Sequence, residues 1–279
     1  MYLWHDGQVV KEEDVRISPF DHGYLYGMGI FETFRTYAGH PFLFDDHIKR
    51  LQMSCAAIGI VIPYTRDELL VAIETLYRAH ATTDLYIRLN VSAGPRDIGL
   101  SVERYDTPTV VIYARPIGAR QATERALETV RLPRSTPETA YRLKSHHYMN
   151  NLVAKRQLFN PEAEGLFLTK EGFICEGITS NIFWRYGEKW YTPSLETGAL
   201  NGITRQFLME QLMVEERLAL LPQLMEADEI LYTNSVQEAV AVSSLDGRTF
   251  PGQSGSGYQR VRQLFDEAVE TRWSRREKR

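Results

Sequence analysis

Two amphipathic helical segments followed by two strand-like runs constrain the fold of the first part of the chain. From Asp45, a candidate N-cap, apolar residues recur at helical spacing. A second helix is predicted over "TRDELLVAIETLYRAH", where Thr65 and Glu68 have the spacing of a capping box. The runs "DLYIRLNVSAG" and "TPTVVIYARP" then have the composition of strands. Because short strands also precede the helices, with Asp6-Gly7 as a hairpin turn, this part is predicted to be α+β.

The rest of the chain continues with strands and helices after a connector, "PIGARQATE". We predict two domains, an α+β domain over residues 1–118 and an α/β domain over residues 119–279. The second domain is expected to contain the helix in "NNLVAKRQLF", a strand-rich block from residue 164 to residue 193, and the amphipathic helix in "NGITRQFLMEQLM". The basic tail "RWSRREKR" has the charge expected at the solvated C-terminal end of a last helix.

Composition narrows the class of protein. The chain has 279 residues, of which 43% are hydrophobic, and this is enough for a sizeable core. A net charge of -4 gives no indication of nucleic-acid binding, and no apolar run approaches the ~20 residues of a membrane span. Cys55 and Cys175 are far apart and no signal peptide is visible, so a reducing cytoplasm is expected. The spacing of Cys, His and carboxylates predicts no metal site.

Two residues of the second half have side chains that suggest chemistry. Lys144, in "RLKSHHYMNN", precedes a helical segment and is either a surface lysine or a reactive amine. Glu176, in "GFICEGITSNIFW", has the strand parity of Ile174 and Ile178, which places a carboxylate on an apolar face. Such a carboxylate needs a cation or a strong donor. The alternatives are a structural salt bridge to an arginine, or a bulge at Gly177 that turns the side chain to solvent.

Three further features have the composition of anion sites. In "LNGITRQF" a helix begins after Gly202, so free backbone N–H groups meet a hydroxyl. The turn in "YTNSVQE" offers hydroxyl and amide donors. Arg50 shares a helix face with His47 and Ser54, where it is either solvated or a phosphate ligand. A plain capped helix and an ordinary turn remain the alternatives for the first two. Together with a lysine and a carboxylate, and without a glycine-rich nucleotide motif, the set suits pyridoxal phosphate (PLP).

The order of these segments resembles the fold-type IV PLP enzymes over nearly the whole chain. That group holds branched-chain aminotransferases, D-amino acid aminotransferases and 4-amino-4-deoxychorismate lyases. The segments that carry the resemblance are "YLYGMGIFETFRTYAG", "HIKRL", "RLKSHHYMNNLVAKRQ", "EGFICEGITSNIFW", "TPSLETGALNGITRQF" and "EADEILYTNSVQEAVAV". The resemblance implies a two-domain fold like that of D-amino acid aminotransferase, a homodimer, and pyridoxal 5'-phosphate as cofactor.

The resemblance also implies roles for residues near the reactive end and the ring of the cofactor. Lys144 matches the lysine that forms the Schiff base. Glu176, in "EGITSN", matches the carboxylate that faces the pyridine nitrogen, and Tyr148 matches the tyrosine beside the phenolic oxygen. His146 and His147 follow the lysine and are given no role.

The phosphate ligands follow from the same resemblance. Arg50, in "HIKRL", matches the phosphate arginine. Ile203 and Thr204, in "GITR", match the phosphate site at a helix start, and Ser235 matches the hydroxyl of the "TNS" turn.

Among the family members, "FETFR", "TNSVQE" and "NNLVAKR" are most similar to aminodeoxychorismate lyases. Thr33 stands where aminotransferases often have an aliphatic residue, and a catalytic hydroxyl is expected there. The D-amino acid enzymes have an Arg-x-His carboxylate trap, whereas this chain keeps Arg96 and has Ile98 in place of the histidine. Arg96 or Arg88 is expected to bind a substrate carboxylate.

The function expected from this resemblance is conversion of 4-amino-4-deoxychorismate to 4-aminobenzoate and pyruvate, a step of folate biosynthesis, with Lys144 as general base. A branched-chain or D-amino acid aminotransferase is the alternative, since it would use the same Lys144 and Glu176. A non-catalytic homologue is a second alternative, against which the retained cofactor-matching residues argue. The expected partners are a small-molecule substrate and a second copy of the chain, with no nucleic acid and no membrane.

Overall fold

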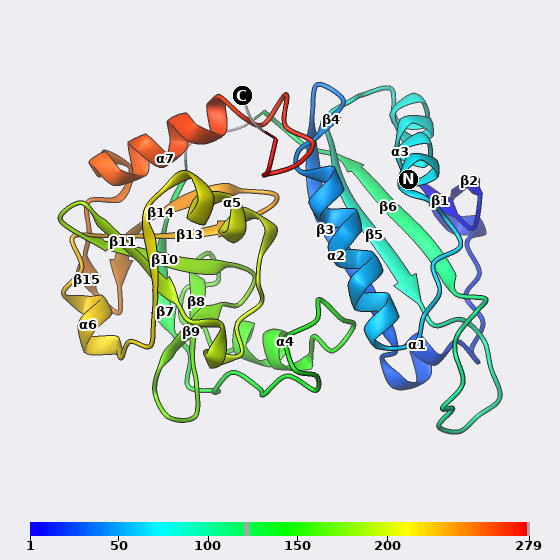
Figure 1. Ribbon diagram of the computed structural model, residues 1–279, viewed down its shortest axis with the longest axis horizontal. Coiled ribbons are helices and arrows are strands. Elements are labelled where there is room, and N and C mark those ends of the chain that lie inside the picture. Colours follow the sequence, from blue (N-terminus) through cyan, green and yellow to red (C-terminus); the bar gives the residue numbers. More distant parts are fainter. Residues whose placement is uncertain (120–122, 278–279) are drawn as a thin grey trace. The chain divides into compact units, whose positions relative to one another are not determined.

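The computed structural model describes residues 1–119 and 123–277, which divide into two compact units (Figure 1). Unit 1 comprises Met1–Ala119, Lys144–His147 and Ala268–Arg279, and unit 2 comprises Arg120–Leu143 and Tyr148–Glu267. The predicted boundary at residue 118 stays a prediction, but this division differs from it in assigning Lys144 and the C-terminal segment to unit 1. Within the described residues, the structure contains no helix that is long and apolar enough to cross a membrane.

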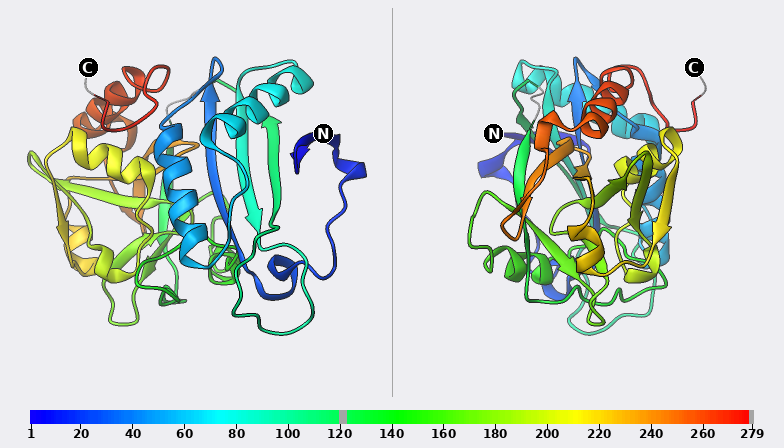
Figure 2. Two further views of the ribbon diagram at one scale, coloured as in Figure 1. Left: turned by 45° about the vertical axis from the view of Figure 1, so that its right-hand side comes forward. Right: turned by 90° about the vertical axis from the view of Figure 1, so that its left-hand side faces the viewer.

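Unit 1 is built on a six-stranded antiparallel sheet in the order β2-β1-β6-β5-β3-β4. Its strands are β1 (Tyr2–His5), β2 (Gln8–Lys11), β3 (Gly29–Tyr37), β4 (His40–Pro41), β5 (Leu85–Ser92) and β6 (Thr109–Pro116). Its helices are α1 (His22–Tyr26), α2 (Phe44–Ala57) and α3 (Arg66–His80), and a 3-10 turn, η1, spans Glu12–Asp14. The helices α2 and α3 pack along one face of the sheet, as the left view of Figure 2 shows.

Local sequence signals of unit 1 are confirmed. The β1–β2 hairpin turns at Asp6 and Gly7, whose φ angles of 44° and 99° are those that an Asp-Gly turn supplies. Thr65 caps α3 and forms the capping box with Glu68. The predicted N-cap of α2 is wrong, because Leu43, in a left-handed conformation, precedes the helix and Asp45 lies in its first turn.

The C-terminal segment explains how α2 begins without a side-chain cap. The carbonyl of Arg272 accepts a hydrogen bond from the Leu43 N–H, and the carbonyl of Trp273 accepts one from the Asp45 N–H. Asp46 in turn accepts the N–H of Arg275. Residues 272–275 of the tail therefore pack on the start of α2 within unit 1. The prediction from charge, a solvated end of a helix, is wrong for this segment.

Unit 2 is built on a nine-stranded mixed sheet in the order β12-β11-β10-β13-β14-β7-β8-β9, with β15 paired to β14. The pairs β14–β7, β7–β8 and β11–β12 are parallel. The strands are β7 (Glu124–Thr129), β8 (Glu164–Leu168), β9 (Ile174–Gly177), β10 (Asn181–Tyr186), β11 (Lys189–Pro193), β12 (Val214–Arg217), β13 (Glu229–Asn234), β14 (Glu238–Leu245) and β15 (Arg248–Thr249). A buried cluster around Trp184 and Tyr232 forms much of its core.

The helices of unit 2 are α4 (Met149–Lys155), α5 (Ile203–Gln211), α6 (Leu221–Met225) and α7 (Ser256–Asp266), with 3-10 turns η2 (Leu195–Thr197) and η3 (Gly252–Ser254). The predicted apolar face of α5 is buried at Ile203, Phe207 and Leu208, whereas Met213 lies beyond the helix and is exposed. Helix α4 begins only at Met149, so Lys144 lies before the helix in an extended segment.

Candidate active site

Lys144 is presented by a segment that pairs with the edge of β3. The Lys144 carbonyl accepts a hydrogen bond from the Phe31 N–H at 2.9 Å, and the His146 N–H donates to the Gly29 carbonyl at 2.9 Å. The Lys144 amine, Nζ, lies 4.6 Å from the centre of the Phe31 ring. Two backbone bonds to a nine-residue strand therefore fix the peptide on both sides of this lysine.

The two histidines after Lys144 explain the glycines in "YGMGIFE". A Cβ on Gly29 would lie 2.1 Å from Cε1 of His146, and a Cβ on Gly27 would lie 2.6 Å from Cδ2 of His147. His146 Nε2 also lies 3.0 Å from the side-chain oxygen of Asn90. Burial and the nearby Arg88 lower the pKa of His146 to about 4, so its ring is neutral at pH 7. His146 therefore packs the lysine segment against β3 and β5, and His147 packs it against the end of α1.

Thr33 and Arg88 lie on the same sheet face as Phe31. Thr33 is directly opposite Arg88 in the β3–β5 register, and opposed residues of an antiparallel pair point to one face. The Arg88 guanidinium lies 3.7 Å from the centre of the Phe31 ring, the same ring that the Lys144 amine approaches. Three residues predicted from the sequence to act on the substrate therefore share one face of unit 1.

Arg35 lies on this face too, and the sequence prediction missed it. It is 6% exposed, one of its terminal nitrogens donates to the Gly118 carbonyl at 3.0 Å, and its Nε has no hydrogen-bond partner among the described residues. The strands β5 and β6 contain no Asp or Glu, and Glu32 of β3 points to the opposite face. This face therefore has cations without a carboxylate on the same strands, which favours an anionic ligand.

Arg50 pairs with Glu32 on the helix-covered face. Its Nε and one terminal nitrogen each lie 2.7 Å from a Glu32 oxygen, and His47 Nδ1 donates to the same carboxylate at 2.7 Å. Burial alone would raise the pKa of Glu32, but Arg50 and His47 lower it to about 2. Arg50 is thus held by a buried carboxylate rather than solvated, and its role as a phosphate ligand remains a prediction.

Arg96 is engaged within its own loop. It forms an ion pair with Glu103 at 2.8 Å, donates to the Arg104 carbonyl, and stacks over the Tyr105 ring. These contacts hold the guanidinium in the loop of residues 95–106. Arg88, on the face that carries Thr33, is therefore better placed than Arg96 for the predicted carboxylate contact.

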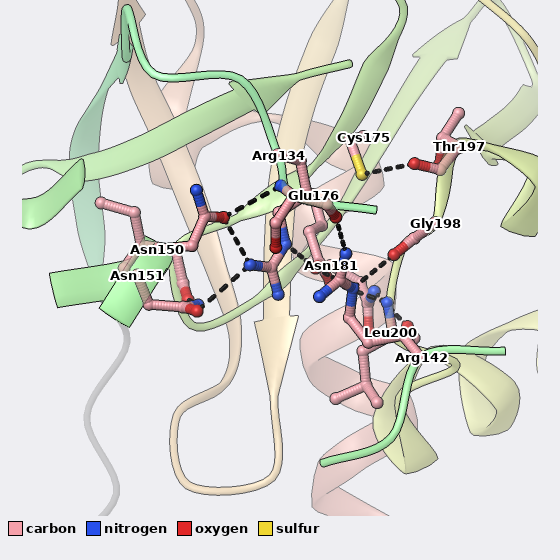
Figure 3. A network of polar contacts seen from close by, with 12 residues as sticks. Arg134, Arg142, Asn150, Asn151, Cys175, Glu176, Asn181, Thr197, Gly198 and Leu200 are labelled. Carbon is pink, nitrogen blue, oxygen red and sulfur yellow. Dashed lines mark hydrogen bonds and ion pairs between the residues drawn. The ribbon is translucent and has the colours of Figure 1, made fainter. Parts of the chain in front are cut away.

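Glu176 in unit 2 is buried, and each of its two carboxylate oxygens accepts a hydrogen bond (Figure 3). Its side chain is 6% exposed. One oxygen accepts from Arg134 Nε at 2.7 Å and the other from the Leu200 N–H at 2.9 Å, while Arg142 Nε lies 3.6 Å away. All four residues of β9 are buried, so no bulge turns Glu176 to solvent. The salt bridge that the sequence left as an alternative is present, and it involves two arginines.

The start of α5 lies next to this network through residues 200–202. Asn181 donates to the Leu200 carbonyl at 2.8 Å, and a Cβ on Gly202 would lie 2.1 Å from the Asn181 side-chain oxygen. Ile203 is the first residue of α5, and Thr204 Oγ1 lies 3.1 Å from Ser235 Oγ. The sequence-predicted phosphate residues of unit 2 thus come together at one helix N-terminus.

Two observations show that this helix start suits an anion. The Thr233 hydroxyl, on the strand that leads to Ser235, is buried and has no hydrogen-bond partner among the described residues. Helix α5 has no side-chain cap at Gly202, so its first N–H groups are not satisfied in that way. Hydroxyls beside the N-terminus of a helix are a donor set for phosphate.

Tyr148, which precedes α4, is half-buried in the same unit.

Known proteins match this chain along most of its length. A family model described as Amino-transferase class IV matches residues 29–245. The aminodeoxychorismate lyase of Bacillus subtilis (strain 168) is 39% identical over 276 residues, which cover 96% of this chain and 94% of that protein.

Solved structures of branched-chain aminotransferases agree with this match. The enzyme of the thermophilic archaeon Thermoproteus uzoniensis, solved with norvaline, matches this structure with a TM-score of 0.86 at 28% identity, covering 97% of this chain and 95% of that one. Another branched-chain amino acid aminotransferase, solved with pyridoxamine 5'-phosphate, matches with a TM-score of 0.87 at 27% identity, covering 96% of this chain and 94% of that one.

Proposed function

The chain belongs to the amino-transferase class IV family, and from that premise we propose that it is an aminodeoxychorismate lyase. The reaction converts 4-amino-4-deoxychorismate to 4-aminobenzoate and pyruvate, a step of folate biosynthesis in the cytoplasm. The fold is that of the fold-type IV enzymes, as the match to solved members of this family establishes. Two observations support the lyase within the family: the 39% identical relative and the cationic sheet face around Thr33.

Pyridoxal 5'-phosphate is the cofactor, and the residues present fit it. We assign the aldehyde to Lys144 and the ring nitrogen to Glu176, whose carboxylate is buried and hydrogen-bonded. The hydroxyls of Thr204 and Ser235, at the start of α5, suit the phosphate, and the unpartnered Thr233 hydroxyl nearby is a further donor. The backbone N–H of Ile203 belongs to the same helix start, and Arg50 and Tyr148 keep the roles that the family resemblance implies.

The chemistry requires one proton to be removed and one C–O bond to be broken. The cofactor, when bound, supplies an electron sink next to the substrate nitrogen. After the substrate amine has replaced Lys144 at the aldehyde, the freed Lys144 amine would accept the proton from C4 of the substrate ring, a contribution of about 10²–10⁴-fold for a positioned base. The electrons of the C3–O bond leave with enolpyruvate, which takes up a proton and becomes pyruvate, and the ring becomes aromatic. Glu176 would hold the proton of the ring nitrogen during both steps.

The carboxylates of the substrate distinguish this reaction from amine exchange on an aliphatic amino acid. Aminodeoxychorismate carries one carboxylate on its ring and one on the enolpyruvyl group. Arg35 and Arg88 lie on the face of Thr33, and no carboxylate on β3, β5 or β6 neutralises them there. We propose that these two guanidinium groups bind the substrate carboxylates, because charge-assisted bonds of this kind are strong in a buried setting. Thr33 donates a hydrogen bond to the enolpyruvyl ether or to a carboxylate.

A branched-chain aminotransferase is the competing function, since solved members of that type have the same fold. Both reactions begin with proton removal by Lys144, so loss of this lysine abolishes either. The test is to supply aminodeoxychorismate and to measure 4-aminobenzoate, and in parallel to supply leucine or D-alanine with 2-oxoglutarate and to measure glutamate. Formation of glutamate without 4-aminobenzoate would replace the lyase by the aminotransferase.

We also propose that the protein is a homodimer. In unit 1 large apolar side chains are exposed on two adjoining segments, tied together by a hydrogen bond from the Gly99 N–H to the Tyr26 hydroxyl. These side chains are Phe20, Tyr24, Leu25, Ile98, Leu100 and Val102. Contiguous exposed apolar surface marks an interaction site in soluble proteins. The test is sedimentation equilibrium of the purified protein. A monomer that has full activity would contradict the homodimer.

A further inference from the structure

Arg134, which comes from the loop between β7 and α4, contacts the carboxylate of Glu176 more closely than any other side chain of the described network. We infer that Arg134 is a positioning residue that fixes the carboxylate of Glu176 for the ring nitrogen of the cofactor. The two side chains come from positions 42 residues apart in the sequence, and the sequence pattern did not indicate which arginine would pair with Glu176.

Contacts with β8 hold Arg134 in place beside Glu176. The backbone N–H of Arg134 donates a hydrogen bond to the Leu168 carbonyl at 2.8 Å. The guanidinium carbon, Cζ, lies 5.0 Å from the centre of the Phe167 ring, and Phe167 is the residue directly opposite Glu176 in the β8–β9 register. The side chain is 6% exposed. A donor anchored in this way loses little conformational entropy on forming its bond to the carboxylate.

Helix α4 also holds Arg134, through the side-chain amides of Asn150 and Asn151. The Nη1 group of Arg134 donates to the side-chain oxygens of Asn150 at 2.7 Å and Asn151 at 3.2 Å (Figure 3). Asn151 is itself buried and donates to the Ile178 carbonyl. Nη1 is thus used by α4, and Nε alone of the described Arg134 donors reaches Glu176. Because Nη1 is bound to α4 and Nε to Glu176, the guanidinium has one orientation, and this orientation fixes the position of the Glu176 carboxylate.

Removal of Arg134 would leave Glu176 with a different partner. Arg142 lies 3.6 Å from the same oxygen, and its own Nε donates to the Gly198 carbonyl. Without Arg134 the carboxylate would turn toward Arg142, its remaining cationic neighbour. This change of direction would weaken the hydrogen bond proposed between Glu176 and a protonated ring nitrogen.

The inference rests on the proposed role of Glu176, and the experiment separates the two. Full-length protein freed of cofactor is titrated with pyridoxal 5'-phosphate and with its 1-deaza analogue, in which a C–H replaces the ring nitrogen. Tryptophan fluorescence reports binding. Both compounds have the same aldehyde and phosphate, so the ratio of their dissociation constants isolates the ring nitrogen. The proteins compared are wild type, Glu176→Gln, Arg134→Gln and, as a matched control, Arg125→Gln, which removes an exposed ion pair with Glu162.

We expect wild type and Arg125→Gln to prefer pyridoxal phosphate by about tenfold or more, the value of one charge-assisted hydrogen bond. In Glu176→Gln and Arg134→Gln the preference should fall to about twofold or less. A preference that survives Glu176→Gln overturns the role of Glu176 itself. A preference lost in Glu176→Gln but kept in Arg134→Gln overturns the inference on Arg134, because a merely structural arginine would weaken both ligands equally.

A second variant covers the case in which Arg134→Gln does not fold. Arg134→Lys keeps the charge, but its single ammonium cannot serve α4 and Glu176 from two separate nitrogens. Its preference should fall by at least about threefold relative to wild type. A wild-type preference in Arg134→Lys would contradict the positioning role.

Discussion

Gly29→Ala tests how the catalytic lysine is held in place. A Cβ at this position would lie 2.1 Å from Cε1 and 2.3 Å from Nδ1 of the His146 ring, whereas ordinary contacts begin at 3.4 Å. The ring therefore has to move by more than about 1 Å. His146 pairs with the Gly29 carbonyl through its own N–H, so its displacement also moves the segment that carries Lys144.

Overpacking by Gly29→Ala should lower the free energy of unfolding by about 1–3 kcal/mol. Part of this loss is offset because an unfolded chain with one glycine fewer has a lower conformational entropy. For a chain of this size the melting temperature should fall by about 2–8 °C. Turnover should fall further than stability indicates, because a displacement of about 1 Å at a reacting group can cost about 10²-fold. Circular dichroism gives the first quantity, and the rate of product formation at saturating cofactor gives the second.

Two controls make this result specific. Gly118→Ala adds the same methyl group where no atom lies within 4 Å, so it should leave both quantities near their wild-type values. In the double variant Gly29→Ala/His146→Ala the ring is gone, and the added cost of the alanine should fall by at least about 1 kcal/mol. The reasoning is refuted if Gly29→Ala costs as much in the His146→Ala background as it does in wild type.

Three other changes test separate residues. Borohydride should fix the cofactor on Lys144, and mass spectrometry that finds it on Lys155 would remove the assignment. Thr33→Val should lower 4-aminobenzoate formation by at least about tenfold, or roughly 1.4 kcal/mol, with cofactor absorbance intact, and an unchanged rate would leave Thr33 without a role. Glu32 has a pKa of about 2 against an ordinary 4.5, so its contribution is present above about pH 4.5 and is lost as the pH falls toward 2. In urea unfolding, Glu32→Gln should therefore lower the free energy of unfolding by on the order of 3 kcal/mol at pH 7 and by clearly less at pH 3. Equal losses at both pH values would refute a stabilising ion pair of Glu32 with Arg50 and His47.

Local signals explain which parts of the structure could be predicted. The Asp6-Gly7 turn and the Thr65–Glu68 capping box depend on residues within a few positions of each other, and both are confirmed. Glu176 was predicted to be buried from strand parity, and it is. These features need no knowledge of distant segments.

Long-range contacts explain what could not be predicted. Helix α2 begins where residues from the C-terminal segment accept its first N–H groups, more than 200 positions away in the sequence. Lys144 precedes α4 because its segment pairs with β3, which no local propensity shows. Arg35 and Arg134 were missed because a buried arginine has the same sequence signature as a solvated one.

Product stoichiometry is the measurement that tests the central claim most directly. Purified protein with pyridoxal 5'-phosphate is supplied with 4-amino-4-deoxychorismate and no 2-oxo acid, and both products are followed over time. The proposed lyase should release 4-aminobenzoate and pyruvate in equal amounts over many turnovers. An aminotransferase would stop after about one turnover per site, because its amine acceptor is absent, and would resume when 2-oxoglutarate is added. Dependence of turnover on the added 2-oxo acid would contradict the lyase.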